Sequence, residues 1–366
     1  MSRHLLVLCV LAAACGGHAA PASTPVPAAS VASGAPAPSA ADRANVERIE
    51  RALADDSMEG RGTATPGGDR AARFLAREMK KIGLTPGGDS AYFQFVPMVV
   101  PATGKRLTVL KNVAALDSYP AARRRRPVNV IGYIPGSDPV LRNQVIVVLS
   151  HYDHLGIAAK PVNGDSIYNG ADDDASGTTA VLEVARHLMA HRPKRTVVFA
   201  NMTGEELGLL GTNYYLAHPR FPLSQVVAGF EIEMIGRPDS LAGGPGKAWL
   251  TGYARSSMGD MLKEYGIAIV PDPRPCQVFF RRSDNYGFAE LGIVAHTLST
   301  FNLHSDYHQV GDDVSKIDFD HMTRVIASAS EAVGHLANGP TPTWHPGMDA
   351  KSMPEVAPAS CPKRGR

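Results

Sequence analysis

The stretch QVIVVLS, residues 144–150, decides the class of fold. Its five central residues are all apolar and most are β-branched, which is typical of a strand buried on both faces of a sheet. Further apolar runs occur on either side of it along the chain. They predict strands at residues 128–133, 194–204, 226–236 and 292–298.

Segments with helical periodicity separate these strands. In residues 69–83, apolar side chains from Ala72 to Ile82 recur on one face, and Gly83 is placed to end the helix. Another helix is expected from Ser176, a suitable N-cap, to residue 191. Further helices are expected at 43–57, 207–218, 256–265 and 319–336. The alternation predicts an α/β fold with a mixed, mostly parallel central sheet flanked by helices on both faces.

Both ends of the chain look separable from this fold. Residues 1–15 combine a positive start, an apolar core and small residues before Cys15, which is typical of a lipoprotein-type secretory signal. An ordinary signal peptide cut near Ala20 is the alternative. Residues 16–41 predict a flexible Ala/Pro/Ser-rich tether, and 341–366 a Pro-rich tail. Residues 42–340 then form one domain.

These ends predict where the protein works. The signal predicts export to the periplasm or the outer membrane, or secretion, with a lipid on Cys15 as the only attachment to a membrane. The net charge of +2 gives no reason to expect a nucleic-acid partner. Cys276 and Cys361 lie outside the signal and could pair in an oxidising compartment, although spacing alone does not establish the bond.

Acidic and histidine residues follow the predicted strands. Ligands of open parallel sheets bind at the carboxyl ends of the strands, so these are the residues to consider. His151 and Asp153 follow the strand at 144–150 and lie on one face of an extended segment. The carboxylate there can orient a metal-binding histidine, although a capped turn would also explain the pair.

A run of three aspartates, Asp172, Asp173 and Asp174, precedes the helix that starts at Ser176. Capping of that helix explains one of these acids or two, but not three. On an extended turn the middle aspartate projects away from the outer pair, so the three are not expected to share one function.

Three further segments carry the same residue types. Glu205 and Glu206 follow the strand at 194–204, where a helix N-terminus would also suit them. Glu231 and Glu233 interrupt an apolar strand, a costly place for carboxylates that are neither paired nor bound to metal. The loop at 304–313, HSDYHQVGDD, is dense in possible ligands.

The five segments together indicate a metal site. Histidines and carboxylates without cysteine suit Zn²⁺, with Mn²⁺ or Co²⁺ as possible substitutes. If one carboxylate bridges two ions, the site belongs to a two-metal hydrolase.

With these segments in this order, the chain resembles the M28 family of di-zinc aminopeptidases over roughly residues 45–338. The segments EGRGTATPGG at 59–68 and RRSDNYGFAELGI at 281–293 are also similar to secreted or lipoprotein members. The resemblance implies the zinc-exopeptidase, phosphorylase/hydrolase-like version of the α/β fold.

The resemblance also implies roles for single residues. The two zinc ions would be held by His151, Asp173, Glu206, Glu233 and His308. Asp173 would bridge the ions, Asp153 would orient His151, and Asp312 is placed to orient His308. Asp174 and Ser176 would begin the following helix, whereas Asp172 is either a partner of the site or a surface acid.

The implied reaction is hydrolysis of the N-terminal peptide bond of a peptide with a free N-terminus. Glu205 would act as the general base, taking a proton from a water held between the ions and passing it to the leaving amine. Two positions depart from the family pattern. Glu233 stands where many members have aspartate, and Phe280 stands where some secreted members have a tyrosine that stabilises the oxyanion. Arg281 is an alternative donor for that charge.

Other functions remain possible on the same fold. A metallo-carboxypeptidase needs a cation for the terminal carboxylate of its substrate, which Arg281 or Arg282 could supply. A glutaminyl cyclase with one zinc would lack some of the five ligands. A non-catalytic, surface-binding lipoprotein would be expected to lose a ligand or the base. Because all five ligands and Glu205 are present, the sequence favours the aminopeptidase; it does not identify the substrate-binding residues or the oligomeric state.

Overall fold

The computed structural model describes residues 41–104, 106–162, 164–353 and 360–361. The predicted signal peptide with Cys15, and the predicted tether up to residue 40, lie outside the described residues. Within the described part the helices are α1 (Arg43–Leu53), α2 (Pro66–Ile82), α3 (Gly177–Ala190), α4 (Leu210–Ala217), α5 (Ser257–Glu264), α6 (Asn285–Glu290) and α7 (Phe319–Asn338). None of them is both long and apolar enough to cross a membrane.

The strands form one large sheet and two small ones. The large sheet contains β1 (Thr85–Pro86), β2 (Phe93–Phe95), β6 (Val128–Ile134), β7 (Val145–His151), β10 (Thr196–Met202), β11 (Val226–Ile232), β12 (Ala248–Leu250), β13 (Ile269–Pro271) and β14 (Ala295–Ser299). The small sheets contain β3 (Met98–Val99), β4 (Thr108–Val109) and β5 (Arg124–Arg125), and the hairpin of β8 (Gly156–Val162) with β9 (Asp165–Tyr168).

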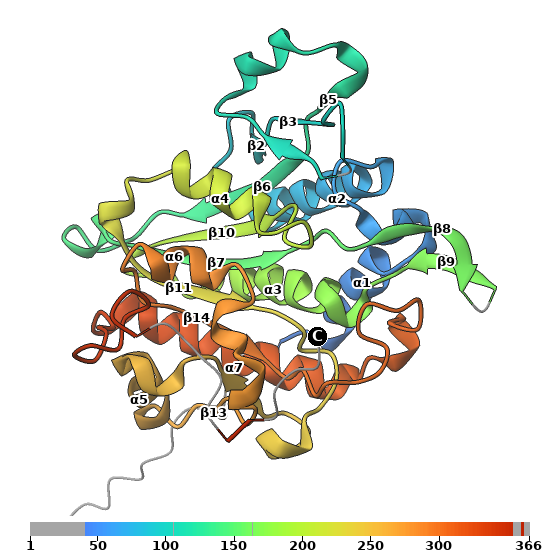
Figure 1. Ribbon diagram of the computed structural model, residues 1–366. Coiled ribbons are helices and arrows are strands. Elements are labelled where there is room, and N and C mark those ends of the chain that lie inside the picture. The colour runs from blue at the N-terminus through green and yellow to red at the C-terminus, as the bar shows by residue number, and fades with distance from the viewer. Residues whose placement is uncertain (1–40, 105, 163, 354–359, 362–366) are drawn as a thin grey trace, which may run out of the picture. The chain divides into compact units, whose positions relative to one another are not determined.

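The centre of the large sheet is parallel, as predicted. Its order is β1-β6-β10-β7-β11-β14-β12-β13, with β2 also paired to β6 (Figure 1). The four central strands β10, β7, β11 and β14 run parallel to one another, whereas β6 and β12 join them antiparallel on either side. The mixed α/β sheet expected from the sequence is therefore confirmed.

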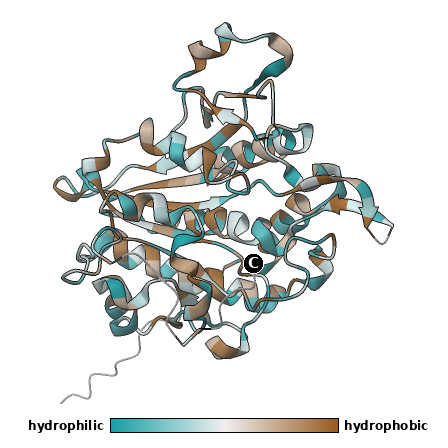
Figure 2. Cartoon of the chain, in the orientation of Figure 1, coloured by the Kyte–Doolittle hydropathy of each residue, from teal (hydrophilic) through white to brown (hydrophobic). Residues whose placement is uncertain are grey.

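The central strand β7 is buried on both faces, and alternate side chains enter two cores. Ile146 and Val148 face the core that α1, α2, α3 and α7 cover. Val147 and Leu149 face the opposite core, which contains residues of α4 and α6. This two-sided burial explains the continuous apolar run. The central strands are correspondingly brown in Figure 2, between helices of mixed hydropathy.

Several helix boundaries differ from the sequence expectation. The helix α1 ends at Leu53 and is followed by a short 3-10 turn, Asp56–Arg61. The helix α2 starts at Pro66 because Thr65 accepts a hydrogen bond from the Gly68 amide and proline suits the first turn. At its end, Gly83 has φ of 91°, as predicted for a C-cap.

The start of α3 also differs, because the prediction that Ser176 caps the helix is wrong. Ser176 has helical backbone angles, and its hydroxyl donates to the Asp172 carbonyl at 2.8 Å. The Gly177 amide instead donates to the carboxylate of Asp174 at 2.9 Å. Asp174 therefore stabilises the start of the helix.

The described part of the predicted C-terminal tail is attached to the domain. The Trp344 ring lies against Phe280 and His296, and its Nε1 donates to the Gly292 carbonyl at 3.0 Å. Further along, Cys361 forms a disulfide with Cys276. The pairing that spacing left open is thus present.

Candidate active site

The predicted site residues converge at the carboxyl ends of three parallel strands. His151 is the last residue of β7, Glu205 and Glu206 follow β10, and Glu233 directly follows β11. These strands are neighbours in the sheet, so their ends lie at one edge. Asp173 reaches the same edge from the segment that precedes α3.

The first group of possible ligands contains His151, Asp173 and Glu233. The His151 Nε2 lies 3.3 Å from Oδ1 of Asp173 and 3.9 Å from Oε1 of Glu233. Zinc bonds of about 2.0–2.1 Å place neighbouring ligand atoms about 3.3 Å apart in a tetrahedron, so the spacing to Asp173 suits one ion and the spacing to Glu233 is longer. Glutamate at position 233 therefore reaches the group despite its longer side chain.

A second group lies on the other side of Asp173. The His308 Nε2 lies 3.1 Å from Oδ2 of Asp173 and 3.3 Å from Oε2 of Glu206. Asp173 thus presents Oδ1 to the first group and Oδ2 to the second. That is the arrangement required of a carboxylate that bridges two ions.

The chemistry of this cluster fits two divalent cations. The buried Nε2 of His151 has no hydrogen-bond partner among the described residues. Although burial raises it, contacts with His151, His154 and His308 hold the pKa of Asp173 well below its ordinary range. Buried carboxylates held in the ionised form need cations beside them.

One imidazole of the cluster was not expected from the sequence. His154 has its Nδ1 2.7 Å from Oε1 of Glu206 and 3.9 Å from Oδ2 of Asp173. It forms a possible ligand group with these two residues. This histidine lies three residues after His151 in the sequence, but the family pattern assigns no role to that position.

Asp153 orients His151 differently from the prediction. Its main-chain carbonyl, not its carboxylate, lies 3.1 Å from Nδ1 of His151; the carboxylate is 3.9 Å away. The carboxylate accepts hydrogen bonds from the Thr63 hydroxyl at 2.7 Å and from the Glu205 amide at 3.2 Å. Asp153 therefore also holds the backbone of the proposed base.

Asp312 does not orient His308, so that prediction is wrong. Its buried carboxylate accepts hydrogen bonds from the amides of Asp172 and Asp173, each at 3.0 Å, and from Arg237 at 3.0 Å. Asp312 instead fixes the backbone of Asp173.

The outer aspartates hold the segment after Glu233. Asp174 accepts a hydrogen bond from the Met234 amide at 3.0 Å, and Asp172 accepts one from the Gly236 amide at 2.7 Å. The other oxygen of Asp172 lies 2.9 Å from Nε2 of His304. Asp172 is fully buried, which rules out the surface acid that the sequence left open.

A buried arginine that the sequence did not single out connects the segments. Arg61 donates hydrogen bonds to the carbonyls of Tyr152, Asn169 and Gly170. It therefore joins the segment after β7 to the segment that carries Asp173. Its side chain is fully buried, so the cost of its charge is offset by these carbonyl contacts.

Glu231 has a structural role rather than a place in the cluster. Its buried carboxylate accepts hydrogen bonds from the hydroxyls of Ser283 and Thr297 and from the amides of Asp284 and Asn285. It thus fixes the segment that precedes α6. Of the two glutamates in this strand, only Glu233 reaches the possible ligands.

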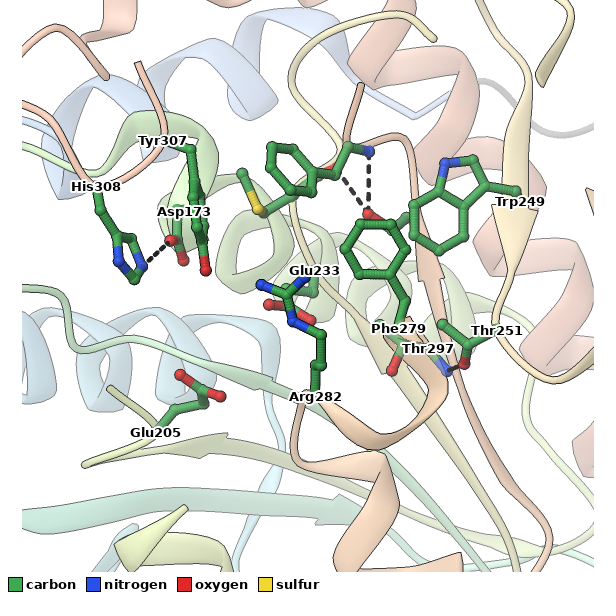
Figure 3. Close-up of a pocket in the computed structure, with 13 residues that line it drawn as sticks. Asp173, Glu205, Glu233, Trp249, Thr251, Phe279, Arg282, Thr297, Tyr307 and His308 are labelled. Carbon is green, nitrogen blue, oxygen red and sulfur yellow. Dashed lines mark hydrogen bonds and ion pairs between the residues drawn. The ribbon is translucent and has the colours of Figure 1, made fainter. Parts of the chain in front are cut away.

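Glu205 lines the pocket beside the cluster (Figure 3). Burial, together with the charges of Glu233, Asp284 and Glu206, raises the pKa of Glu205 well above its ordinary value. A carboxylate with raised proton affinity suits a general base.

The pocket continues from the acids to an aromatic wall. Figure 3 shows Asp173, Glu205 and His308 at one side, and Phe279 and Trp249 at the other. The rings of Trp249 and Phe279 are stacked with their centroids 5.2 Å apart. An apolar side chain of a substrate would find its contacts there.

The structure locates the residues that the sequence connected with the oxyanion. Phe280 is fully buried against Tyr286 and Trp344 and does not line the pocket. Arg282, rather than Arg281, lines the pocket, with its guanidinium 5.0 Å from the centre of the Phe279 ring. Arg281 is not among the residues that line the pocket, and its expected role as a donor stays a prediction.

Comparison with known proteins agrees with this geometry. The sequence profile of peptidase family M28 matches residues 129–333, more than half of the chain. The chain belongs to peptidase family M28. The matched residues include each of the five predicted ligands.

Fungal proteins are among its M28-like relatives. The chain is 25% identical over 333 residues to a probable zinc metalloprotease of Pyricularia oryzae, covering 79% of this chain and 62% of that protein. It is 29% identical over 238 residues to probable leucine aminopeptidase 2 of Aspergillus fumigatus, covering 58% and 45% respectively. The chain thus spans less than two thirds of the length of these relatives.

Solved bacterial structures share the fold. The zinc aminopeptidase BSAP from Bacillus subtilis has a TM-score of 0.59 at 15% identity, covering 82% of this chain and 96% of that one. The aminopeptidase from Aneurinibacillus sp. strain AM-1 has a TM-score of 0.58 at 16% identity, covering 82% and 95%. At these identities the likeness concerns the fold alone, and it agrees with the zinc-exopeptidase fold expected from the sequence.

Proposed function

We propose that this chain is a two-zinc aminopeptidase that hydrolyses the N-terminal peptide bond of peptides. The observation that carries the proposal is the position of Asp173, whose two carboxylate oxygens face two separate groups of histidine and carboxylate. A single structural ion would not need a carboxylate shared in this way.

The residues divide into those that hold zinc and one that moves a proton. His151 and Glu233 would hold one ion, Glu206 and His308 would hold the other, and Asp173 would contribute one oxygen to each. When bound, zinc lowers the pKa of water and polarises a carbonyl group. Glu205 takes a proton from the attacking water and gives it to the leaving amine, a role that its position in the pocket beside the cluster allows. Asp153 holds the backbone of Glu205 and the ring of His151.

The substrate is a peptide with a free N-terminus. The protonated or neutral amine is placed next to the carboxylates of Glu205 and Glu233, and the first side chain enters the pocket towards Phe279 and Trp249. The protein acts outside the cytosol, because the predicted secretory signal precedes the domain and the disulfide between Cys276 and Cys361 is stable in oxidising compartments. Attachment to a membrane is through a lipid on Cys15.

The test measures hydrolysis and metal content together. Purified protein is assayed with an aminoacyl chromogenic substrate and with the same substrate blocked at its amine, while zinc is counted by elemental analysis. We expect about two zinc ions per chain and cleavage of the free amine only. Cleavage of both substrates at equal rates, or activity without bound metal, would contradict the proposal.

The mutation Glu205→Gln separates chemistry from metal binding. The amide cannot take a proton, so turnover should fall by about 10²- to 10⁴-fold while zinc content stays unchanged. Turnover close to that of the wild type would exclude Glu205 as the base. Glu264→Gln, at an exposed glutamate of α5, serves as the matched control.

A metallo-carboxypeptidase is the second candidate, and Arg282 is the observation that favours it. Its guanidinium lines the pocket that contains Asp173, Glu205 and Glu233, where it could bind a terminal carboxylate (Figure 3). A peptide blocked only at its amine and one blocked only at its carboxyl end distinguish the candidates. Cleavage of the first but not the second would replace the aminopeptidase with the carboxypeptidase.

A further inference from the structure

His154 is the buried imidazole of the cluster that the five-ligand scheme does not use. Its side chain has no exposed surface, and it lies three residues after His151 in the segment following β7. Its Nδ1 is 2.7 Å from Oε1 of Glu206. A buried histidine directed at a metal-binding carboxylate could be a further ligand or could hold the carboxylate in place.

The distances between the nitrogen and oxygen atoms of the cluster distinguish a metal ligand from a residue that holds the carboxylate. The proposed ligand atoms lie 3.3 Å apart between His151 and Asp173, and 3.3 Å apart between His308 and Glu206. Both values agree with the spacing of about 3.3 Å between ligands of one tetrahedral zinc. The 2.7 Å contact of His154 is shorter and lies within the range of a charge-assisted N–H···O hydrogen bond. The contact is not in hydrogen-bond geometry in this structure, so the role requires the Glu206 carboxylate to rotate relative to the ring.

The two oxygens of Glu206 face different histidines. Oε1 faces His154, whereas Oε2 lies 3.3 Å from Nε2 of His308. A donor on Oε1 therefore fixes the plane of the carboxylate and directs Oε2 towards the second ion. Metal-binding carboxylates commonly depend on such outer partners.

The position of the His154 ring is itself fixed. Gly170 has φ of 56°, and a Cβ at this position would lie 2.6 Å from Cγ and Cδ2 of His154. The ring thus occupies the space that a side chain at 170 would need. Arg61 holds the carbonyl of Gly170 at 2.7 Å, which keeps this neighbour in place.

We propose that His154 is a positioning residue for the second zinc ion, acting by donating its Nδ1–H to Glu206. This role rests on the proposed two-zinc function. It predicts that the two ions differ in their dependence on His154: the ion held by Glu206 and His308 needs it, whereas the ion held by His151 and Glu233 does not.

The variants His154→Leu and His154→Asn test this role. Leucine and asparagine have nearly the same shape, but only asparagine offers an N–H near the position of Nδ1. The metal-loaded proteins are titrated with a zinc chelator, and the zinc retained is measured at each concentration. For His154→Leu we expect one ion to keep its wild-type affinity and the other to bind about 10- to 100-fold more weakly. His154→Asn should lie much closer to the wild type.

The titration also defines what would overturn the role. Equal weakening in both variants would indicate packing or direct coordination by the ring, and unchanged affinity in both would indicate no role. Weakening of the ion at His151 alone would contradict the assignment to Glu206. If the wild type binds two ions, any of these results overturns the role of His154 and leaves the proposed function unchanged. If the wild type binds no zinc, the proposed function itself is overturned. Thermal unfolding of both variants shows whether they are folded.

Discussion

At the scale of single residues, the three consecutive aspartates have different functions because their carboxylates point in different directions. Asp173 faces both groups of possible ligands, whereas Asp172 and Asp174 accept hydrogen bonds from the segment after Glu233. The outer acids therefore fix the position of one proposed ligand, and Asp312 fixes the backbone of another. A single run of charged residues thus contains both the proposed bridge and two residues that support the site.

The mutation Asp173→Ala should remove both ions, because each depends on one oxygen of this side chain. Outer partners of metal ligands already contribute about 10- to 100-fold to affinity, so loss of the bridge should cost more than about 100-fold for each ion. Zinc content after dialysis measures this. Asp117→Ala, at an exposed aspartate, is the control and should keep its zinc. Retention of two ions without Asp173 would exclude the bridge.

At this scale, the sequence predicted residues of the cluster where the family pattern assigns them a role. It indicated five residues that the structure brings close together: His151, Glu206 and Glu233 at or after strand ends, and Asp173 and His308 from other segments. It did not identify His154 or Arg61, and it misassigned Asp312. Those three act through contacts between segments distant in sequence, which periodicity and local motifs do not contain.

At the scale of elements, the apolar runs predicted the central strands well because burial on both faces leaves a clear signal. Helix starts were less predictable. The helix α3 is stabilised at its start by the carboxylate of Asp174 rather than by Ser176, since Ser176 contacts Asp172 and the Ile235 amide instead. The contacts of Ser176 with other segments thus prevent it from capping α3.

The contact between α1 and α3 contains a buried glutamate with a pH-dependent effect on stability. Glu50 accepts a hydrogen bond from the Thr179 hydroxyl at 3.0 Å, and burial raises the pKa of Glu50 to about 8. At pH values between the ordinary pKa of glutamate, 4.5, and about 8, Glu50 is therefore protonated in the folded protein and ionised in the unfolded chain. Between these values, the contribution of Glu50 to stability falls as pH rises.

The variant Glu50→Gln should remove this dependence. The free energy of unfolding of the variant minus that of the wild type should therefore increase by about 3 to 5 kcal/mol from pH 4.5 to pH 8. Urea unfolding at several pH values measures the difference. A constant difference across this range would mean that Glu50 is ionised in the folded protein.

At the scale of the whole molecule, the C-terminal segment belongs to the structure around the pocket. The disulfide of Cys361 holds Cys276, three residues before Phe279 in the wall of the pocket. Trp344 packs on Phe280 in the same segment. The sequence suggested a separable tail after residue 340 because its composition is rich in proline. It offered the disulfide only as a possibility, since pairing depends on the folded path of the chain.

Replacement of both cysteines, Cys276→Ser with Cys361→Ser, should loosen this wall of the pocket. We expect the free energy of unfolding to fall by about 2 to 4 kcal/mol, because the bond closes a long loop. KM for the aminoacyl substrate should rise while kcat changes less, since neither cysteine is among the proposed ligands. A larger loss of kcat than of binding would indicate that the bond supports the metal site instead.

The two-ion arrangement around Asp173 is tested most directly by anomalous diffraction at the zinc edge, from crystals of the zinc-loaded protein. Two peaks are predicted, both next to the carboxylate of Asp173. One should lie about 2.0–2.2 Å from ligand atoms of His151 and Glu233, and the other at the same distance from Glu206 and His308. A single peak, or two peaks that do not share Asp173, would contradict the account.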